Sequence, residues 1–124
     1  MSFVVDAHQH FWIYGTYQTS WMEMPPYAGD SAFQPLRRSF QPGDLMPELK
    51  AAGVHCTVAV EAANGPAEND ALLANLRNHE RIAGVVGWAP LAHLSDLERT
   101  LDSRAGESAL VGIRHLVNVE PDPD

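Results

Sequence analysis

Cysteine is almost absent from this sequence of 124 residues, because Cys56 is the only one. A single thiol excludes an intramolecular disulfide framework. Its neighbours Val54, Val58 and Val60 instead predict that Cys56 is a small apolar residue on a buried strand. The sequence also lacks apolar runs long enough to cross a membrane as a helix. Residues 1–3 carry neither the basic nor the apolar region of a secretory signal, so we expect a cytoplasmic protein.

Basic residues are scarce as well. The chain has 8 Lys and Arg against 16 Asp and Glu, which gives a net charge of −8. This excess of negative charge repels a phosphate backbone and an anionic lipid surface, and the only adjacent basic pair is Arg37–Arg38. We therefore expect neither nucleic acid nor a membrane as a partner. What is abundant is apolar sequence, at 45% hydrophobic residues, which suffices for one globular domain with a core.

Strand and helix patterns alternate along most of the chain. Short β-prone runs predict strands at residues 3–8, 54–60, 82–88 and 110–117. Apolar residues at helical spacing predict helices at residues 44–52, 67–79 and 95–103. Asp44 and Ser95 are the predicted N-caps of the first and third helices. Residues 11–42 contain several prolines, glycines and aromatic residues, which predicts a long loop that covers a site.

Strands that alternate with helices of this length predict parallel β-α-β units, and hence an α/β protein. Four strands form half of a (β/α)8 TIM barrel, whose usual size is about 250 residues. The chain ends at residues 120–124, directly after a predicted strand and without the helix that would cover it. We therefore expect residues 1–124 to be a truncated barrel domain of the metal-dependent hydrolase type, with its C-terminal half absent.

The second predicted strand carries two different faces. One face holds Cys56, Val58 and Val60, and we expect these residues to pack against helices. The other face holds three smaller or polar residues, Thr57, Ala59 and Glu61. We expect this second face to line the barrel interior, with Glu61 at the C-terminal rim where barrel enzymes carry catalytic groups. The same alternation in the fourth strand predicts that Arg114 points inward together with Gly112.

The most informative motif is Asp6-Ala7-His8-Gln9-His10, at the end of the first predicted strand. Side chains alternate along a strand, so His8 and His10 project to the same side and can share one divalent cation, such as zinc. A catalytic metal also needs a further ligand and an open position for water, which later strands would have to supply. Two histidines near a strand end are also compatible with ordinary polar rim residues, and the motif alone does not establish a metal site.

The run Val5-Asp6-Ala7-His8-Gln9-His10-Phe11-Trp12 resembles the opening signature of the amidohydrolase-related sugar lactonases, a branch similar to the L-rhamnono- and L-fucono-lactonases. Three further segments fall in the order and spacing of that family: residues 38–45, 84–88 and 112–117. The resemblance covers the whole chain but only the first half of the family's domain. Its most specific part is the His-Gln-His-Phe-Trp run.

This resemblance implies roles for individual residues. His8 and His10 match the family's first-strand pair, which holds a divalent metal such as zinc. Glu61 matches a polar residue that closes the second strand, and Arg114 matches a substrate-binding arginine that closes the fourth. The family's further histidine and its aspartate general base would lie beyond Asp124. Because some similar lactonases need no metal, the resemblance leaves the metal requirement open.

Other site candidates follow from their chemistry. Arg114 could bind the carboxylate of a lactone product through two parallel hydrogen bonds, or it could form an ordinary ion pair with Glu61 or another carboxylate. Trp12 and Trp21 are predicted to stack on a substrate ring, although aromatic residues in a loop commonly only pack. Trp88 ends the third strand and either reaches the site or packs in the core. We expect packing for Tyr27 and a helix-facing position for His115. Solvated positions are expected for His55, His79 and His93.

Three functions are compatible with these patterns. The first is an enzyme that opens a small sugar lactone by attack of water on the ring carbonyl. The second keeps the barrel but changes the reaction to decarboxylation or to hydrolysis of another cyclic ester or amide. The third is an inactive association module, in which unpaired strand edges bind a second copy or a complementing half-barrel. We expect the isolated segment to be inactive.

Overall fold

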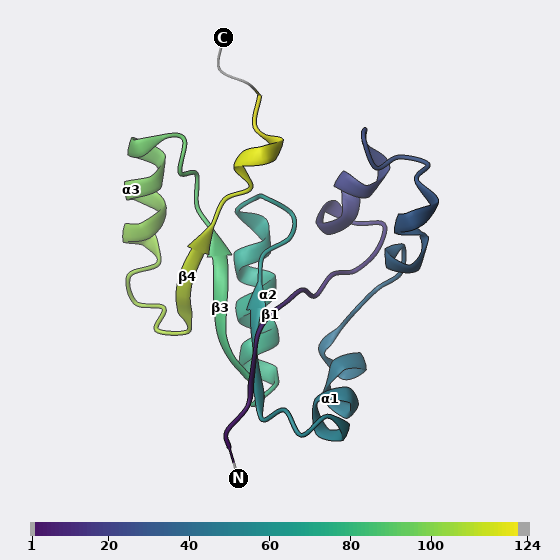
Figure 1. Cartoon of the computed structure of the whole chain (residues 1–124). Coiled ribbons are helices and arrows are strands. Elements are labelled where there is room, and N and C mark those ends of the chain that lie inside the picture. The colour runs from purple at the N-terminus through teal and green to yellow at the C-terminus, as the bar shows by residue number, and fades with distance from the viewer. Residues whose placement is uncertain (1, 122–124) are drawn as a thin grey trace.

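The computed structural model describes residues 2–121, which form one parallel sheet with helices between its strands (Figure 1). The strands are β1 (Val5–Gln9), β2 (Cys56–Val60), β3 (Ile82–Trp88) and β4 (Leu110–Arg114). The helices are α1 (Pro42–Ala51), α2 (Ala67–Asn78) and α3 (Leu94–Ser103). The strand order is β1-β2-β3-β4 and each neighbouring pair is parallel. This sequential order is that of successive strands in a barrel wall.

The main core lies between the sheet and α2. Leu72 and Leu73 of α2 are fully buried against Ala59, Ile82 and Val85 of the sheet. Burying a side chain of this size contributes about 1.5–3 kcal/mol. This packing fixes α2 on one face of the sheet and leaves the strand ends free to carry polar groups. No helix within residues 2–121 has the length and apolarity needed to cross a bilayer.

The predicted orientation of β2 is wrong. Ala59 belongs to the core beneath α2, so the face of Ala59 is the one turned to the helices. Val58 and Val60 therefore face the opposite side, which becomes the interior of a barrel. The prediction fails because a parallel strand is apolar on both faces, and the smaller residue faces α2. Glu61 still reaches the rim, because it follows the last residue of β2.

Several predicted element boundaries also shift. β4 ends at Arg114, and a short 3-10 turn, Val117–Val119, follows it. α1 begins at Pro42, where proline fits the first turn, and Asp44 is not its N-cap. The Asp44 carboxylate instead accepts a hydrogen bond from the Gln41 N–H (2.9 Å). α3 begins one residue before Ser95, so Ser95 lies inside the first turn rather than at the cap.

The long segment between β1 and α1 is a small packed unit beside the sheet (Figure 1). It contains two 3-10 helices, η1 (Tyr17–Glu23) and η2 (Ser31–Leu36). Trp12 and Phe40 exchange two backbone hydrogen bonds of 2.9 Å and so hold its two ends together. Met22 is fully buried in a second apolar cluster inside this unit. We call residues 11–40 the aromatic loop.

Candidate active site

The carboxyl ends of the four strands meet at one edge of the sheet, and a cavity of about 870 Å³ opens there. Its walls come from the end of β1, the aromatic loop, the β2–α2 connection and the end of β4. Four of the predicted site residues line it: His10, Trp12, Trp21 and Arg114. A smaller cavity of about 380 Å³, lined by residues that include Lys50 and Arg81, lies at the opposite ends of the strands. In barrel enzymes, residues at that end contribute to stability and the active site lies at the other end.

His8 lies near the end of β1, and His10 is the first residue after that strand. Their ring centroids are 5.0 Å apart and the rings are nearly perpendicular, at 83°. His10 Nδ1 is 2.8 Å from the Val60 carbonyl oxygen. Because a carbonyl only accepts, Nδ1 must carry the proton, which leaves the Nε2 lone pair of a neutral ring available. Burial, helped by the charge of Arg114, lowers the pKa of His10 and so favours that neutral form.

Glu61 and Arg114 join the ends of β2 and β4. Arg114 donates from Nη1 to the Glu61 carbonyl oxygen (3.0 Å), and its Nε lies 3.6 Å from Glu61 Oε1. The Glu61 side chain is fully buried, and its Oε2 accepts from the Asn64 N–H (2.8 Å). Burial raises the pKa of Glu61, while the Asn64 N–H and Arg114 oppose that rise. Arg114 therefore pairs with Glu61 and also lines the cavity, and its binding of a substrate carboxylate stays a prediction.

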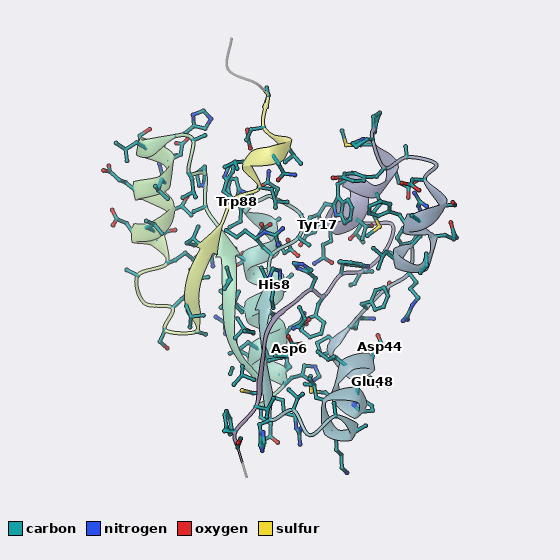
Figure 2. All side chains as sticks on the ribbon, viewed as in Figure 1. Asp6, His8, Tyr17, Asp44, Glu48 and Trp88 are labelled. Atoms are coloured by element: carbon teal, nitrogen blue, oxygen red, sulfur yellow. The ribbon has the colours of Figure 1, made fainter. Side chains whose placement is uncertain are left out.

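Trp88 lies at the rim, at the end of β3 (Figure 2), but does not line the cavity. Its indole N–H donates to Asn64 Oδ1 (2.9 Å), and its ring stacks on His115 with centroids 5.6 Å apart. The prediction that His115 faces a helix is wrong, because β4 has already ended. His115 instead lies within 3.0 Å of the Ala89 carbonyl oxygen and 2.7 Å of Glu120. These two contacts raise the pKa of His115.

The aromatic loop forms the apolar wall of the cavity. Trp12 donates its indole N–H to the Arg38 carbonyl oxygen (2.8 Å), and Trp21 donates to that of Gln18 (3.2 Å). The two indoles meet edge to face, at 85°. Tyr27 packs against Trp21 as expected, and it lines the cavity too. One side of the cavity is therefore apolar and the other carries Arg114.

Sequence reasoning missed two buried polar residues at the start of α2. Glu68 Oε2 accepts from the Ala62 and Ala63 N–H groups, at 2.8 and 2.7 Å. Asn69 holds the end of β3, because its Oδ1 accepts from the Trp88 N–H (2.7 Å) and its Nδ2 donates to the Trp88 carbonyl oxygen (2.9 Å). Their position in the first turn of the predicted helix 67–79 was the available signal, since first-turn side chains can reach a preceding loop.

Residues 5–124 match the sequence model of a protein family described as amidohydrolase. The chain belongs to the amidohydrolase family. Among curated proteins, this amidohydrolase chain is 33% identical over 124 residues to L-fucono-1,5-lactonase of Burkholderia ambifaria, and 32% identical over 118 residues to L-fucono-1,5-lactonase of Burkholderia multivorans. These alignments cover 100% and 95% of the chain but 40% and 37% of the relatives. The chain thus spans about two-fifths of their length.

Solved structures agree with the fold. A crystal structure of an amidohydrolase from Burkholderia multivorans with bound zinc superimposes with a TM-score of 0.77 at 31% identity. A second crystal structure of such a protein, with bound HEPES, gives a TM-score of 0.79 at 30% identity. Each match covers 98% of this chain and 39% of the other. The predicted architecture is confirmed, because the parallel sheet corresponds to the N-terminal part of an amidohydrolase barrel.

The donor set of this amidohydrolase chain fits part of a zinc site. His8 and His10 are neighbours, and the Nδ1–H of His10 bonds a backbone carbonyl, as the outer nitrogen of a metal-binding histidine commonly does. Within residues 2–121, however, no three His, Cys, Asp or Glu side chains come together in a group that could hold an ion. Two imidazoles alone fall short of the three protein ligands of a catalytic zinc site.

Proposed function

We propose that this chain supplies the first part of the active site of a hydrolase that opens a small sugar lactone by attack of water on the ring carbonyl. The observation that carries the proposal is the pair of adjacent imidazoles, His8 and His10, at the end of the sheet where His10 and Arg114 line one cavity. The two relatives named L-fucono-1,5-lactonase support the substrate class. The substrate would be a small molecule, a lactone or the carboxylate derived from it.

His8 and His10 would hold a divalent metal ion, such as zinc, together with ligands from other residues. When bound, such an ion polarises a carbonyl and makes water a nucleophile at neutral pH. The hydrogen bond from His10 Nδ1 to the Val60 carbonyl orients the ring and leaves the Nε2 lone pair available to a ligand. The depressed pKa of His10 keeps that lone pair free of a proton.

The remaining residues bind and orient the substrate. Arg114 has five N–H donors and uses only part of them on Glu61, so the guanidinium can also donate to a lactone carbonyl or a carboxylate. Glu61 holds Arg114 at the rim. Trp12 and Trp21 offer apolar surface to a sugar ring, and Trp88 supports the rim from outside the cavity through its bond to Asn64.

The test replaces both histidines, His8→Ala with His10→Ala, and uses exposed His93→Ala as the matched control. Hydrolysis of L-fucono-1,5-lactone is followed by acid release, for the chain alone and after mixing with the remaining part of the B. multivorans lactonase. Zinc binding is measured separately by calorimetry. We expect the double variant to lose both turnover and zinc binding with an unchanged circular dichroism spectrum. Unchanged turnover in the double variant would rule the proposal out.

A panel of substrates distinguishes lactone hydrolysis from the other reactions that this fold can catalyse. Aldonolactones are compared with aromatic carboxylic acids and with other cyclic esters and amides, because one fold hosts many chemistries. Turnover of the aldonolactones alone agrees with the proposal.

The cytoplasmic location stays a prediction.

A further inference from the structure

Asn64 occupies an unusual backbone position at the cavity. It lies in the connection between β2 and α2 and lines the cavity together with Arg114. Its φ is +51°, in the left-handed region that L-residues rarely adopt and that asparagine tolerates better than most. Such a conformation persists only where the surroundings hold it. Here the Asn64 N–H donates to the buried carboxylate of Glu61, at 2.8 Å.

The side-chain oxygen of Asn64 is fully occupied. Asn64 Oδ1 accepts from the indole N–H of Trp88 (2.9 Å) and from the backbone N–H of Leu116 (3.0 Å). Both partners are donors only, so they decide which end of the carboxamide is oxygen and which is nitrogen. Through these bonds Asn64 connects the ends of β2, β3 and β4.

The side-chain nitrogen of Asn64 is then the free end. Nδ2 carries two N–H donors, and within residues 2–121 the structure gives it no hydrogen-bond partner. Arg114, on the same cavity wall, also presents donors and no acceptors. This side of the cavity therefore offers N–H groups to oxygen atoms, while the aromatic loop offers apolar surface to the other side.

We propose that Asn64 is a further ligand-binding residue, whose Nδ2 donates to a hydroxyl or carbonyl oxygen of the molecule bound by Arg114. This inference rests on the proposed function, because it assigns a contact to the same polyhydroxylated lactone or its acid. The ligand class follows from the donors: a compound with several oxygen acceptors on one edge and an apolar face on the other. The bond of Oδ1 to Trp88 keeps the amide in one orientation.

The experiment titrates the ¹⁵N-labelled chain with L-fuconate, which is inert to hydrolysis, and follows side-chain resonances by NMR. The Asn64 side-chain amide should shift with ligand concentration. Asn64→Asp keeps an acceptor oxygen for Trp88 and Leu116 but removes the Nδ2 donors. We expect its Kd to rise about tenfold, while the Trp88 indole N–H stays hydrogen-bonded and protected from exchange with solvent. Asn78→Asp, on the exposed end of α2, adds the same charge away from the cavity and should leave the Kd unchanged.

Salt dependence separates a lost donor from charge repulsion. Repulsion between Asp at position 64 and the ligand carboxylate weakens as salt is added, whereas a missing hydrogen bond does not recover. The inference is overturned if Asn64→Asp binds as tightly as the parent, if high salt restores its affinity, or if the Asn64 amide does not move. If the parent binds no L-fuconate and hydrolyses no lactone even after mixing with the remaining part of the B. multivorans lactonase, the proposed function fails as well. If the parent binds L-fuconate and Asn64→Asp binds it with the same Kd, this inference fails while the proposed function stands.

Discussion

Glu68 is a carboxyl group placed where water does not reach. It is fully buried, and one of its oxygens has no hydrogen-bond partner in the described part of the chain. Burial raises the pKa of Glu68, and the neighbouring carboxylate of Glu61 raises it further, against two backbone N–H bonds that lower it. The folded state therefore holds this proton more tightly than the unfolded chain does.

This raised pKa fixes the sign of a pH effect. The stabilisation from the protonated carboxyl is complete below the unfolded pKa and is lost as the pH rises through the folded pKa. Glu68→Gln keeps an oxygen for Ala62 and Ala63 and removes the titration, so its free energy of unfolding should fall less than that of the parent between about pH 4.5 and pH 7. Urea unfolding at several pH values measures this, with exposed Glu98→Gln as the control. An identical slope in Glu68→Gln and the parent would contradict the assignment.

Gly87 of β3 leaves no room for a side chain beneath α2. A Cβ built there would lie 2.5 Å from Asn69 Oδ1 and 2.7 Å from Leu110 Cδ1. Gly87→Ala must therefore displace the side chain that holds Trp88 by two hydrogen bonds, at a cost of about 1–3 kcal/mol of stability. Gly106→Ala, where nothing lies within 4 Å, is the matched control and should change stability little. Thermal unfolding of both variants compares them, and equal melting temperatures would refute the close approach.

The aromatic loop is an element stabilised by one buried guanidinium. Arg37 donates to the Asp30, Met22 and Tyr27 carbonyl oxygens, at 2.9, 3.3 and 3.0 Å. Its side chain is 10% exposed, so a substitution leaves these carbonyls without a donor. Hydrogen bonds to a charged group contribute about 1.5–3 kcal/mol each.

Arg37→Met should therefore open the loop locally while the sheet stays folded. Amide hydrogen exchange is expected to accelerate within residues 17–36 and to remain unchanged in β2 and β3. Arg99→Met is the control, because Arg99 is exposed on α3 and, within residues 2–121, its side chain forms an ion pair with Asp96 alone. Uniform acceleration across the whole chain would show instead that the loop and the sheet unfold together.

Strands and helices with a clear pattern of apolar residues could be predicted from the sequence. Which face of each element is turned to the core could not always be predicted. β3 has the predicted limits, because Ile82–Trp88 is a compact apolar run. β2 is found where expected but faces the other way, since its residues are apolar on both faces and only the contact of Ala59 with α2 decides between them. The position of a strand can thus be predicted from its own residues. Which of its faces is turned to the helices depends on the helix that packs against it.

The candidate site divides in the same way. The pair His8 and His10 and the inward Arg114 follow from alternation along a strand, which is a property of neighbouring residues. Asn64 and Glu68 could not be assigned, because their partners are backbone and side-chain groups on other elements, brought near by the fold. Residues that serve a site through loop geometry leave no periodic signal in the sequence.

At the scale of the whole molecule, the described residues leave apolar surface uncovered. β1 and β4 are the two outermost strands, and each pairs on one side within residues 2–121. Val111 on β4 is 60% exposed, and Leu94 on α3 is 70% exposed. No residue of α3 is buried, although its leucines form one stripe. Open strand edges next to apolar side chains bind further strands.

We therefore expect the isolated chain to associate through the β4 edge, with a second copy as the partner when no complementing half-barrel is present. Val111→Lys places a charge on that edge, which opposes strand pairing, and should shift the sedimentation profile toward the monomer. Val117→Lys makes the same change at a valine that is 72% exposed but lies outside the strands, so it should leave the profile unaltered. If the parent chain sediments as a monomer at every concentration, the β4 edge does not pair with a second copy. The function as an association module is then excluded.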